Sequence, residues 1–152
     1  MKEIKWIDSE KYQEICKQIP IPAVDLVVVN NKYQVLLLRR AVPPVEAIGT
    51  WCLPGGGIMI GETPLDTAKR KLLEETGLEA SSFIESGHAV TYMFKGKQNI
   101  AIGMIVWARD FEVKMNYEHN DYKWVAFKDL PVLMLPSTVE QVRICMHILG
   151  IQ

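Results

Sequence analysis

The segment from residue 63 to residue 77 constrains the fold most, because it marks both ends of one helix. Thr63 can cap this helix, and Pro64 suits its first turn. Asp66 completes a Thr-x-x-Asp capping box, in which two backbone N–H groups gain partners. Gly77 stands where a residue in left-handed conformation commonly stops a helix. The sequence therefore predicts a helix of about four turns with fixed ends.

The predicted helix has one apolar face and follows a glycine run. Leu65, Ala68 and Leu72 recur at helical spacing, which predicts a buried stripe against another layer of the protein. Gly55, Gly56 and Gly57 come shortly before it and predict a loop in which the backbone can approach a ligand without a Cβ in the way.

The other expected elements alternate between strands and helices. We expect an opening helix over 8–18, a loop over 41–50, a last helix that starts with a second capping box at 137–140, and strands over 24–29, 34–39, 51–53, 87–94, 100–108 and 122–127. Asn30-Asn31-Lys32 predicts a hairpin between the first two strands, since asparagine tolerates left-handed backbone. Mixed strands between two substantial helices predict an α/β/α sandwich, here one domain over residues 1–152.

Charge and hydropathy exclude several classes of protein. The net charge of −1 gives no global basic field for nucleic acid or anionic membrane, although a local basic patch stays possible. No apolar run is long enough to span a bilayer, and the first residues do not resemble a signal peptide. The three cysteines are widely spaced and odd in number, which favours free buried thiols in a reducing cytoplasm.

Charged side chains gather beside the apolar stripe of the helix. At about 100° per residue, Lys71, Glu74 and Glu75 fall on one arc next to that stripe. Two carboxylates there would suit Mg²⁺, or Mn²⁺, which leaves positions for water and substrate phosphate. Arg70 lies four residues before Glu74 and is expected to hold its carboxylate. For an arbitrary helix, a solvated face with ion pairs would be the better interpretation.

The spacing of the whole segment argues for the functional interpretation. From Gly56 it reads Gly-x5-Glu62-x7-Arg70, followed by Leu72, Glu74, Glu75, Gly77 and Leu78. This resembles the Nudix box, and the resemblance extends from about residue 22 to 124. It implies a Nudix-type α/β/α sandwich with a mixed central sheet. It also implies metal binding by the Gly55 carbonyl, Glu74 and Glu75, substrate contacts by Gly56 and Gly57, and structural roles for Glu62 and Arg70.

One box position departs from the family, which usually has a metal-binding glutamate where this chain has Lys71. The change adds a cation to a site built to hold cations, so we expect fewer Mg²⁺ ions than in a full box. Lys71 could also swing out and pair with Glu74 or Glu75 at a cost in activity. A third alternative is that its ammonium replaces one metal as a ligand of substrate phosphate.

A second motif, Glu118-His119, precedes the 122–127 strand in an expected loop over the cleft. Nudix enzymes often place a glutamate here as metal ligand or general base. The pattern also resembles the GDP-mannose mannosyl hydrolase group, in which a metal-binding glutamine and a catalytic histidine match these two positions. We therefore assign Glu118 to the metal and assign Glu118, His119 and Glu74 to catalysis, with an exposed loop imidazole as the alternative for His119. Arg40 is the expected diphosphate contact.

These observations predict a hydrolase of a small nucleotide-type substrate, and not a nucleic-acid or membrane protein. The expected substrate is a nucleoside diphosphate linked to another moiety, preferably a sugar. Attack at phosphorus and attack at the sugar carbon both stay open. A catalytically weak domain that binds a nucleotide as a sensor is the alternative, and a homodimer is possible.

Overall fold

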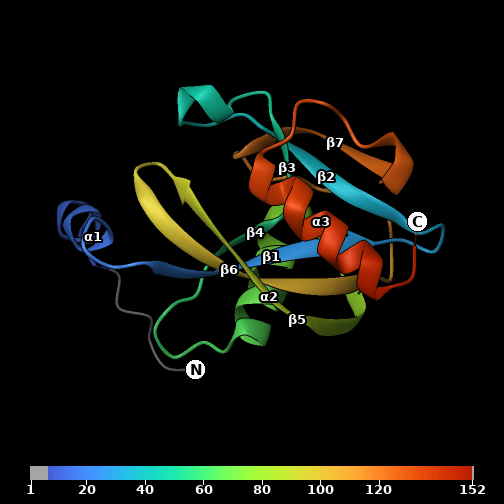
Figure 1. Ribbon diagram of the computed structural model, residues 1–152, viewed down its shortest axis with the longest axis horizontal. Coiled ribbons are helices and arrows are strands. Elements are labelled where there is room, and N and C mark those ends of the chain that lie inside the picture. Colours follow the sequence, from blue (N-terminus) through green and yellow to red (C-terminus); the bar gives the residue numbers. More distant parts are fainter. Residues whose placement is uncertain (1–6, 152) are drawn as a thin grey trace.

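The helix with fixed ends forms as the sequence predicts and covers one face of a mixed sheet. It is α2 (Pro64–Thr76) in the computed structural model, which describes residues 7–151. Thr63 and Asp66 form the complete capping box, and Gly77 ends the helix at φ 65°. A second helix, α3 (Pro136–Ile148), crosses the opposite face of the sheet (Figure 1). The α/β/α sandwich is therefore confirmed.

The sheet contains seven strands, and two 3-10 turns and a short opening helix complete the chain. In chain order these elements are α1 (Ser9–Cys16), β1 (Ile21–Val29), β2 (Gln34–Arg40), η1 (Val45–Ala47), β3 (Trp51–Cys52), β4 (Gly55–Gly57), β5 (Ala80–Phe94), β6 (Lys97–Ala108), β7 (His119–Ala126) and η2 (Phe127–Asp129). Asp8 caps α1 by accepting from the Lys11 N–H at 3.0 Å.

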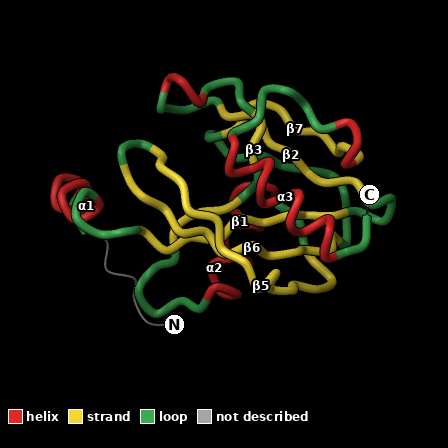
Figure 2. The backbone as a smooth tube through the Cα atoms, viewed as in Figure 1, coloured by secondary structure: helices red, strands yellow, loops and turns green. Residues whose placement is uncertain are grey.

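The topology separates the first two strands over most of their length. The strand order is β3-β2-β1-β6-β5, with β4 on β1 and β7 on β2. β1 runs parallel to β6, while the paired residues of β1 and β2 are Val29 and Val35 at the hairpin end. Away from that end, β4 pairs with β1, whereas β3 and β7 pair with β2 (Figure 2). The pocket described below lies at the end of the sheet where β1 and β2 have separated.

Alternation along the strands divides the core into two layers. Val24, Leu26 and Val28 of β1 pack with α2, while Val27 and Val29 pack with α3. All five of these side chains are fully buried. In α3, Val142 and Met146 are buried, and Leu149 packs against the same cluster from the end of the helix.

Two expectations about the helices are wrong. Leu65 is 38% exposed, so the buried face of α2 is made by Ala68 and Leu72 together with Thr67 and Thr76. The second capping box does not form either, because α3 begins earlier, with Pro136 in its first turn and no side-chain cap. Proline at that point already fixes the helical backbone, which moves Ser137 inside the helix.

Three expectations about strands and turns also need correction. The glycines at 55–57 form strand β4 rather than a loop, and Gly55 pairs with Asp25. The residue in left-handed conformation in the first hairpin is Tyr33, at φ 58°, while the Asn30 side chain accepts from two backbone N–H groups. β5 begins at Ala80 rather than at 87, because irregularities in its register carry it past Gly87.

The remaining sequence-level expectations concern cysteines and membrane spans. Cys16, Cys52 and Cys145 are free and buried. Within residues 7–151, no helix has the length and apolar character that crossing a bilayer requires.

Candidate functional site

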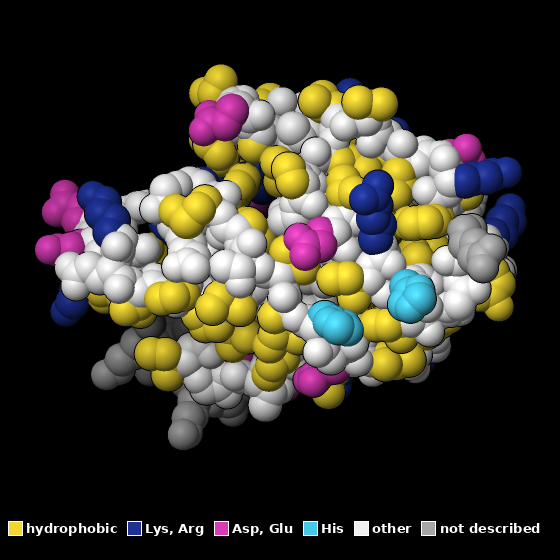
Figure 3. All heavy atoms as spheres, viewed as in Figure 1, with side chains coloured by type: hydrophobic (Ala, Val, Ile, Leu, Met, Phe, Trp, Pro, Cys, Tyr) yellow, Lys and Arg dark blue, Asp and Glu magenta, His cyan; other side chains and the backbone are white. Residues whose placement is uncertain are grey.

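A pocket opens where the glycine strand, the carboxyl-bearing face of α2 and the start of α3 meet. Figure 3 shows a hollow in the surface on the α3 side, between the β5–β6 hairpin and the loops that carry η1. The predicted site residues that line the pocket are Arg40, Gly55, Gly56, Gly57, Lys71, Glu75, Glu118 and His119. The pocket thus brings together side chains from β2, β4, α2 and β7.

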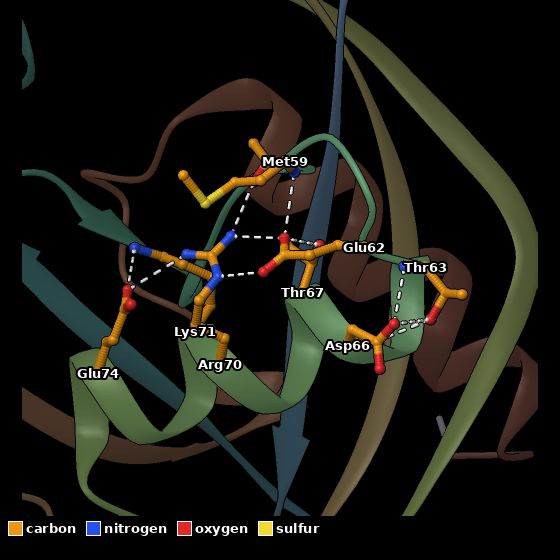
Figure 4. A network of polar contacts seen from close by, with 9 residues as sticks. Met59, Glu62, Thr63, Asp66, Thr67, Arg70, Lys71 and Glu74 are labelled. Carbon is orange, nitrogen blue, oxygen red and sulfur yellow. Dashed lines mark hydrogen bonds and ion pairs between the residues drawn. The ribbon is translucent and has the colours of Figure 1, made fainter. Parts of the chain in front are cut away.

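Glu62 and Arg70 connect α2 to the segment before it (Figure 4). Two Arg70 nitrogens donate to Glu62 at 2.6 and 2.9 Å, and a third contact reaches the Gly57 carbonyl at 3.1 Å. Glu62 also accepts from Thr67 and from the Met59 N–H. The hydrogen bonds from Arg70 are the main reason that the pKa of Glu62 falls to about 2. Arg70 also contacts Glu74, as expected, but at the longer distance of 3.4 Å, so Glu62 is its main partner.

Glu75 is the buried acid of the pocket. Its side chain is 4% exposed and accepts from the Gly55 N–H at 2.9 Å. Burial raises the pKa of Glu75 to about 7, while Lys71 and the Gly55 N–H act in the opposite direction. A carboxylate held between a backbone N–H and a cation is oriented before any ligand binds.

Lys71 crosses the glycine strand and occupies the space between the acids. Its Nζ lies 3.1 Å from Glu75 and 3.4 Å from Glu74, and its side chain is 12% exposed. A Cβ added at Gly56 would meet the Lys71 side chain at 2.9 Å. Burial alone would lower the pKa of Lys71, but the combined attraction of Glu75, Glu118 and Glu74 outweighs it and raises the pKa. Lys71 therefore pairs with both glutamates, as one of the alternatives expects, but it does so inside the pocket and does not swing out.

Glu74 stands apart from the other predicted ligands. It is not among the residues that line the pocket, and its side chain, which is 48% exposed, pairs with Arg70 and Lys71. Within residues 7–151, no three His, Cys, Asp or Glu side chains form a group that could hold a metal ion. The predicted set of Glu74, Glu75 and Glu118 is thus not assembled as one cluster, because the Lys71 ammonium lies on the acids of α2.

The oxygen donors that remain still suit a hard divalent cation. Glu75, Glu118 and the backbone of Gly55 all line the same pocket. Carboxylate and carbonyl oxygens are the ligands that Mg²⁺ and Mn²⁺ prefer. Because Lys71 already neutralises part of the negative charge, this donor set fits one such cation shared with substrate better than a site for several.

His119 begins strand β7, which corrects the expectation of an overhanging loop. The residue is 6% exposed, and its Nε2 lies 3.8 Å from the Cys52 sulfur. Nδ1 is buried without a hydrogen-bond partner in the described part of the chain. Burial lowers the pKa of His119 to about 4, and burial also raises the pKa of the Cys52 thiol to about 12. Both groups are therefore neutral near pH 7, and the exposed-imidazole alternative is wrong.

A bulge between Arg39 and Arg40 directs the two arginines to different places. Arg39 pairs with Asp121, whereas Arg40 pairs across the bulge with His119 and lines the pocket. Arg40 lies 5.1 Å from the centroid of the Phe94 ring, and its Nε is buried without a described partner. A cation in this position is available to an anionic ligand, as the sequence predicts for Arg40.

The far side of the pocket is formed by residues outside the two predicted motifs. Further lining residues come from β1, from the β5–β6 hairpin and from the start of α3, and they are Asp25, Tyr92, Phe94, Lys95, Asn99, Ser137 and Thr138. Burial raises the pKa of Asp25 to about 7, and the Gln141 side chain partly offsets this. Asp25 does carry a signal in the sequence, because it is the only charged residue in the strand sequence IPAVDLVVV. The other residues carry no local pattern that marks them.

Comparison with known proteins identifies relatives of this chain. The NUDIX domain model matches residues 20–144. The chain is 31% identical over 114 residues to the rat asymmetrical bis(5'-nucleosyl)-tetraphosphatase, a match that covers 72% of each chain. It is 31% identical over 140 residues to an RNA pyrophosphohydrolase of Mesorhizobium japonicum, covering 76% of this chain and 81% of that one. The crystal structure of a MutT protein from Methanosarcina mazei superposes with a TM-score of 0.74 at 28% identity, covering 84% and 95% of the two chains.

Proposed function

The chain belongs to the NUDIX domain family and is a hydrolase, and we propose that it cleaves the diphosphate bond of a nucleoside diphosphate linked to another moiety. Buried Glu75 carries this proposal. It is an acid held by the Gly55 N–H at 2.9 Å, in a pocket that also contains Glu118, Arg40 and His119. An acid placed in this way supports phosphate chemistry that depends on a bound cation.

Glu75, Glu118 and the Gly55 carbonyl would hold one Mg²⁺ or Mn²⁺, and this ion would offset phosphate charge and lower the pKa of a bound water. Gly57 leaves space beside it, since an added Cβ would meet its nearest neighbour only at 3.9 Å. Arg40 would contact an oxygen of the diphosphate through its buried guanidinium.

His119 supplies a neutral imidazole beside Glu118. The low pKa of about 4, caused mainly by burial, keeps His119 neutral near pH 7, and its Nδ1, which has no described partner, can accept a hydrogen bond. A proton acceptor must be within reach of the proton that it removes, and both residues line the same pocket. We assign Glu118 and His119 to the movement of that proton, while Glu74 would act through its contact with Lys71.

The names of the relatives favour attack at phosphorus over attack at a sugar carbon. The two relatives described above are named for cleaving a tetraphosphate and for pyrophosphohydrolysis. Neither name supports a nucleotide sugar as substrate or a resemblance to the GDP-mannose mannosyl hydrolase group. A nucleotide sugar therefore stays one candidate in a panel that also contains dinucleoside polyphosphates and nucleoside triphosphates. A homodimer stays a prediction.

Lys71 gives a second candidate function some support. An ammonium already placed 3.1 Å from Glu75 would compete with a metal and could leave a domain that binds nucleotides but turns them over poorly. Such a domain would serve as a sensor or partner module.

Release of phosphate-containing products from the nucleotide panel, with and without Mg²⁺, separates the two candidates. We expect turnover of at least one compound that requires Mg²⁺ and is lost in Glu75→Gln, which keeps the shape but removes the charge. Asp66→Asn on the exposed start of the same helix is the control, and it should retain turnover. Nucleotide binding without any turnover would favour the sensor.

A further inference from the structure

Asp25 interrupts an otherwise apolar strand and faces the pocket. Its neighbours Val24 and Leu26 belong to the core layer under α2, while Val27 belongs to the layer under α3. Alternation therefore turns Asp25 toward the α3 side, where it lines the pocket together with Ser137 at the start of that helix. β1 lies between β4 and β6 in the sheet (Figure 1), and the Asp25 side chain lines the pocket from this strand.

The carboxyl group of Asp25 has no cation to balance it. Within residues 7–151, no Lys, Arg or His nitrogen lies within 4.0 Å of its oxygens, whereas Glu75 in the same pocket has Lys71 at 3.1 Å. Oδ1 lies against Gly55, 3.1 Å from the position that a Cβ there would take. The Gln141 side chain offsets only part of the cost of burying this carboxyl group, and a ligand that offers hydrogen-bond donors would remove more of it.

The groups around Asp25 suit a flat, partly polar ligand. Tyr92 and Asn99 are directly paired across β5 and β6, and both line the pocket. Phe94 follows on the same face of β5, with the Arg40 guanidinium over its ring. Aromatic rings beside amide and carboxyl groups provide stacking surfaces and hydrogen-bond partners for a nucleobase.

We propose that Asp25 selects a guanine-type base by accepting hydrogen bonds from its N1–H and 2-amino groups. A carboxylate offers two acceptor oxygens side by side. Guanine is the standard base whose pairing edge presents two adjacent donors, whereas adenine places a ring acceptor beside its amino group. Hypoxanthine keeps N1–H but lacks the 2-amino group. This inference rests on the proposed function, because it identifies the base of the nucleotide that the pocket would take.

Calorimetric binding of GMP, IMP and AMP tests the assignment without any turnover. The wild-type chain should bind GMP about tenfold or more tightly than IMP, and AMP more weakly still, as expected for a lost bidentate contact. In Asp25→Asn the preference for GMP over IMP should disappear while IMP binding is retained. Asp121→Asn makes the same chemical change on β7, where Asp121 pairs with Arg39, and should keep the wild-type preference.

Two results would overturn the proposal. Equal binding of GMP and IMP by the wild-type chain would do so whether or not Asp25→Asn folds. An equal loss of all three nucleotides in a folded Asp25→Asn would make Asp25 a structural residue instead. Because these ligands contain no diphosphate bond, selective GMP binding by a chain that hydrolyses nothing would refute the proposed function and leave this inference standing.

Discussion

Replacing Lys71 by glutamate should increase the affinity for Mg²⁺. In the structure, the Lys71 ammonium lies 3.1 Å from Glu75 and 3.4 Å from Glu74, so it already neutralises the charge that a metal would use. At an effective dielectric constant of about 20, a pair of unit charges at the shorter distance attracts by about 5 kcal/mol. Only part of this energy is available, because the cost of desolvating the buried Lys71–Glu75 pair opposes it. Water also screens the contact between Lys71 and Glu74, which is 48% exposed.

We expect about 1.4–2.8 kcal/mol of the Coulomb energy to appear as tighter metal binding, which corresponds to a ten- to hundredfold lower Kd. Isothermal calorimetry of Mg²⁺ with wild type and Lys71→Glu measures this change directly. Lys69→Glu is the matched control, because it introduces the same charge on an exposed face of α2.

The outcome discriminates between local and general electrostatics. An unchanged or weaker affinity in Lys71→Glu would refute the argument that Lys71 competes with the metal at Glu75. An equal gain in Lys69→Glu would show that net charge alone is responsible. Turnover is a separate question: if Lys71 also contacts substrate phosphate, turnover will fall even though Mg²⁺ binds more tightly.

Three further changes probe the supports of the site. Gly55→Ala should destabilise the fold by about 2 kcal/mol or more, since the new Cβ would clash with the Val24 carbonyl oxygen. Gly57→Ala, with its nearest neighbour at 3.9 Å, should change the midpoint of urea unfolding little, and equal effects of the two substitutions would contradict this. Glu62→Gln should make the free energy of unfolding depend less on pH below about 4.5. Because Arg70 holds the pKa of Glu62 in the folded protein at about 2, the stability that Glu62 contributes is present above its ordinary pKa and is lost as pH falls from about 4.5 to about 2. Parallel acid-unfolding curves for the two proteins would refute that role. His119→Gln should reduce turnover without changing Mg²⁺ affinity, and full activity would remove His119 from the mechanism.

Much of the fold was predictable because local chemistry determines it. The capping box at Thr63 and Asp66 and the stop at Gly77 depend on neighbouring residues alone, and all three occur as expected. The glycine strand was not predictable in the same way. Gly55 pairs with Asp25, 30 residues earlier, and the Val24 carbonyl leaves no space for a Cβ there. A local pattern records the absence of a side chain but not the strand that requires it.

The site residues also differ in whether local spacing or distant contacts place them. Residues within the box, such as Glu75 and Lys71, could be placed on one face of a helix from their spacing, and they do lie together. The role of Arg70 could not, because its main partner Glu62 lies in the segment before the helix and competes with the helical neighbour Glu74. Asp25 reaches the pocket only because β1 lies between β6 and β4, an arrangement with no sequence signature of its own.

Hydrolysis in ¹⁸O-labelled water tests the central claim most directly. The wild-type chain is incubated with Mg²⁺ and the best compound of the nucleotide panel, and the products are analysed by mass spectrometry. Attack at phosphorus by water predicts one ¹⁸O atom in a phosphate-containing product, with none in the other moiety. Label in a released sugar, or an absence of product with every compound of the panel, would contradict a diphosphate hydrolase built around Glu75.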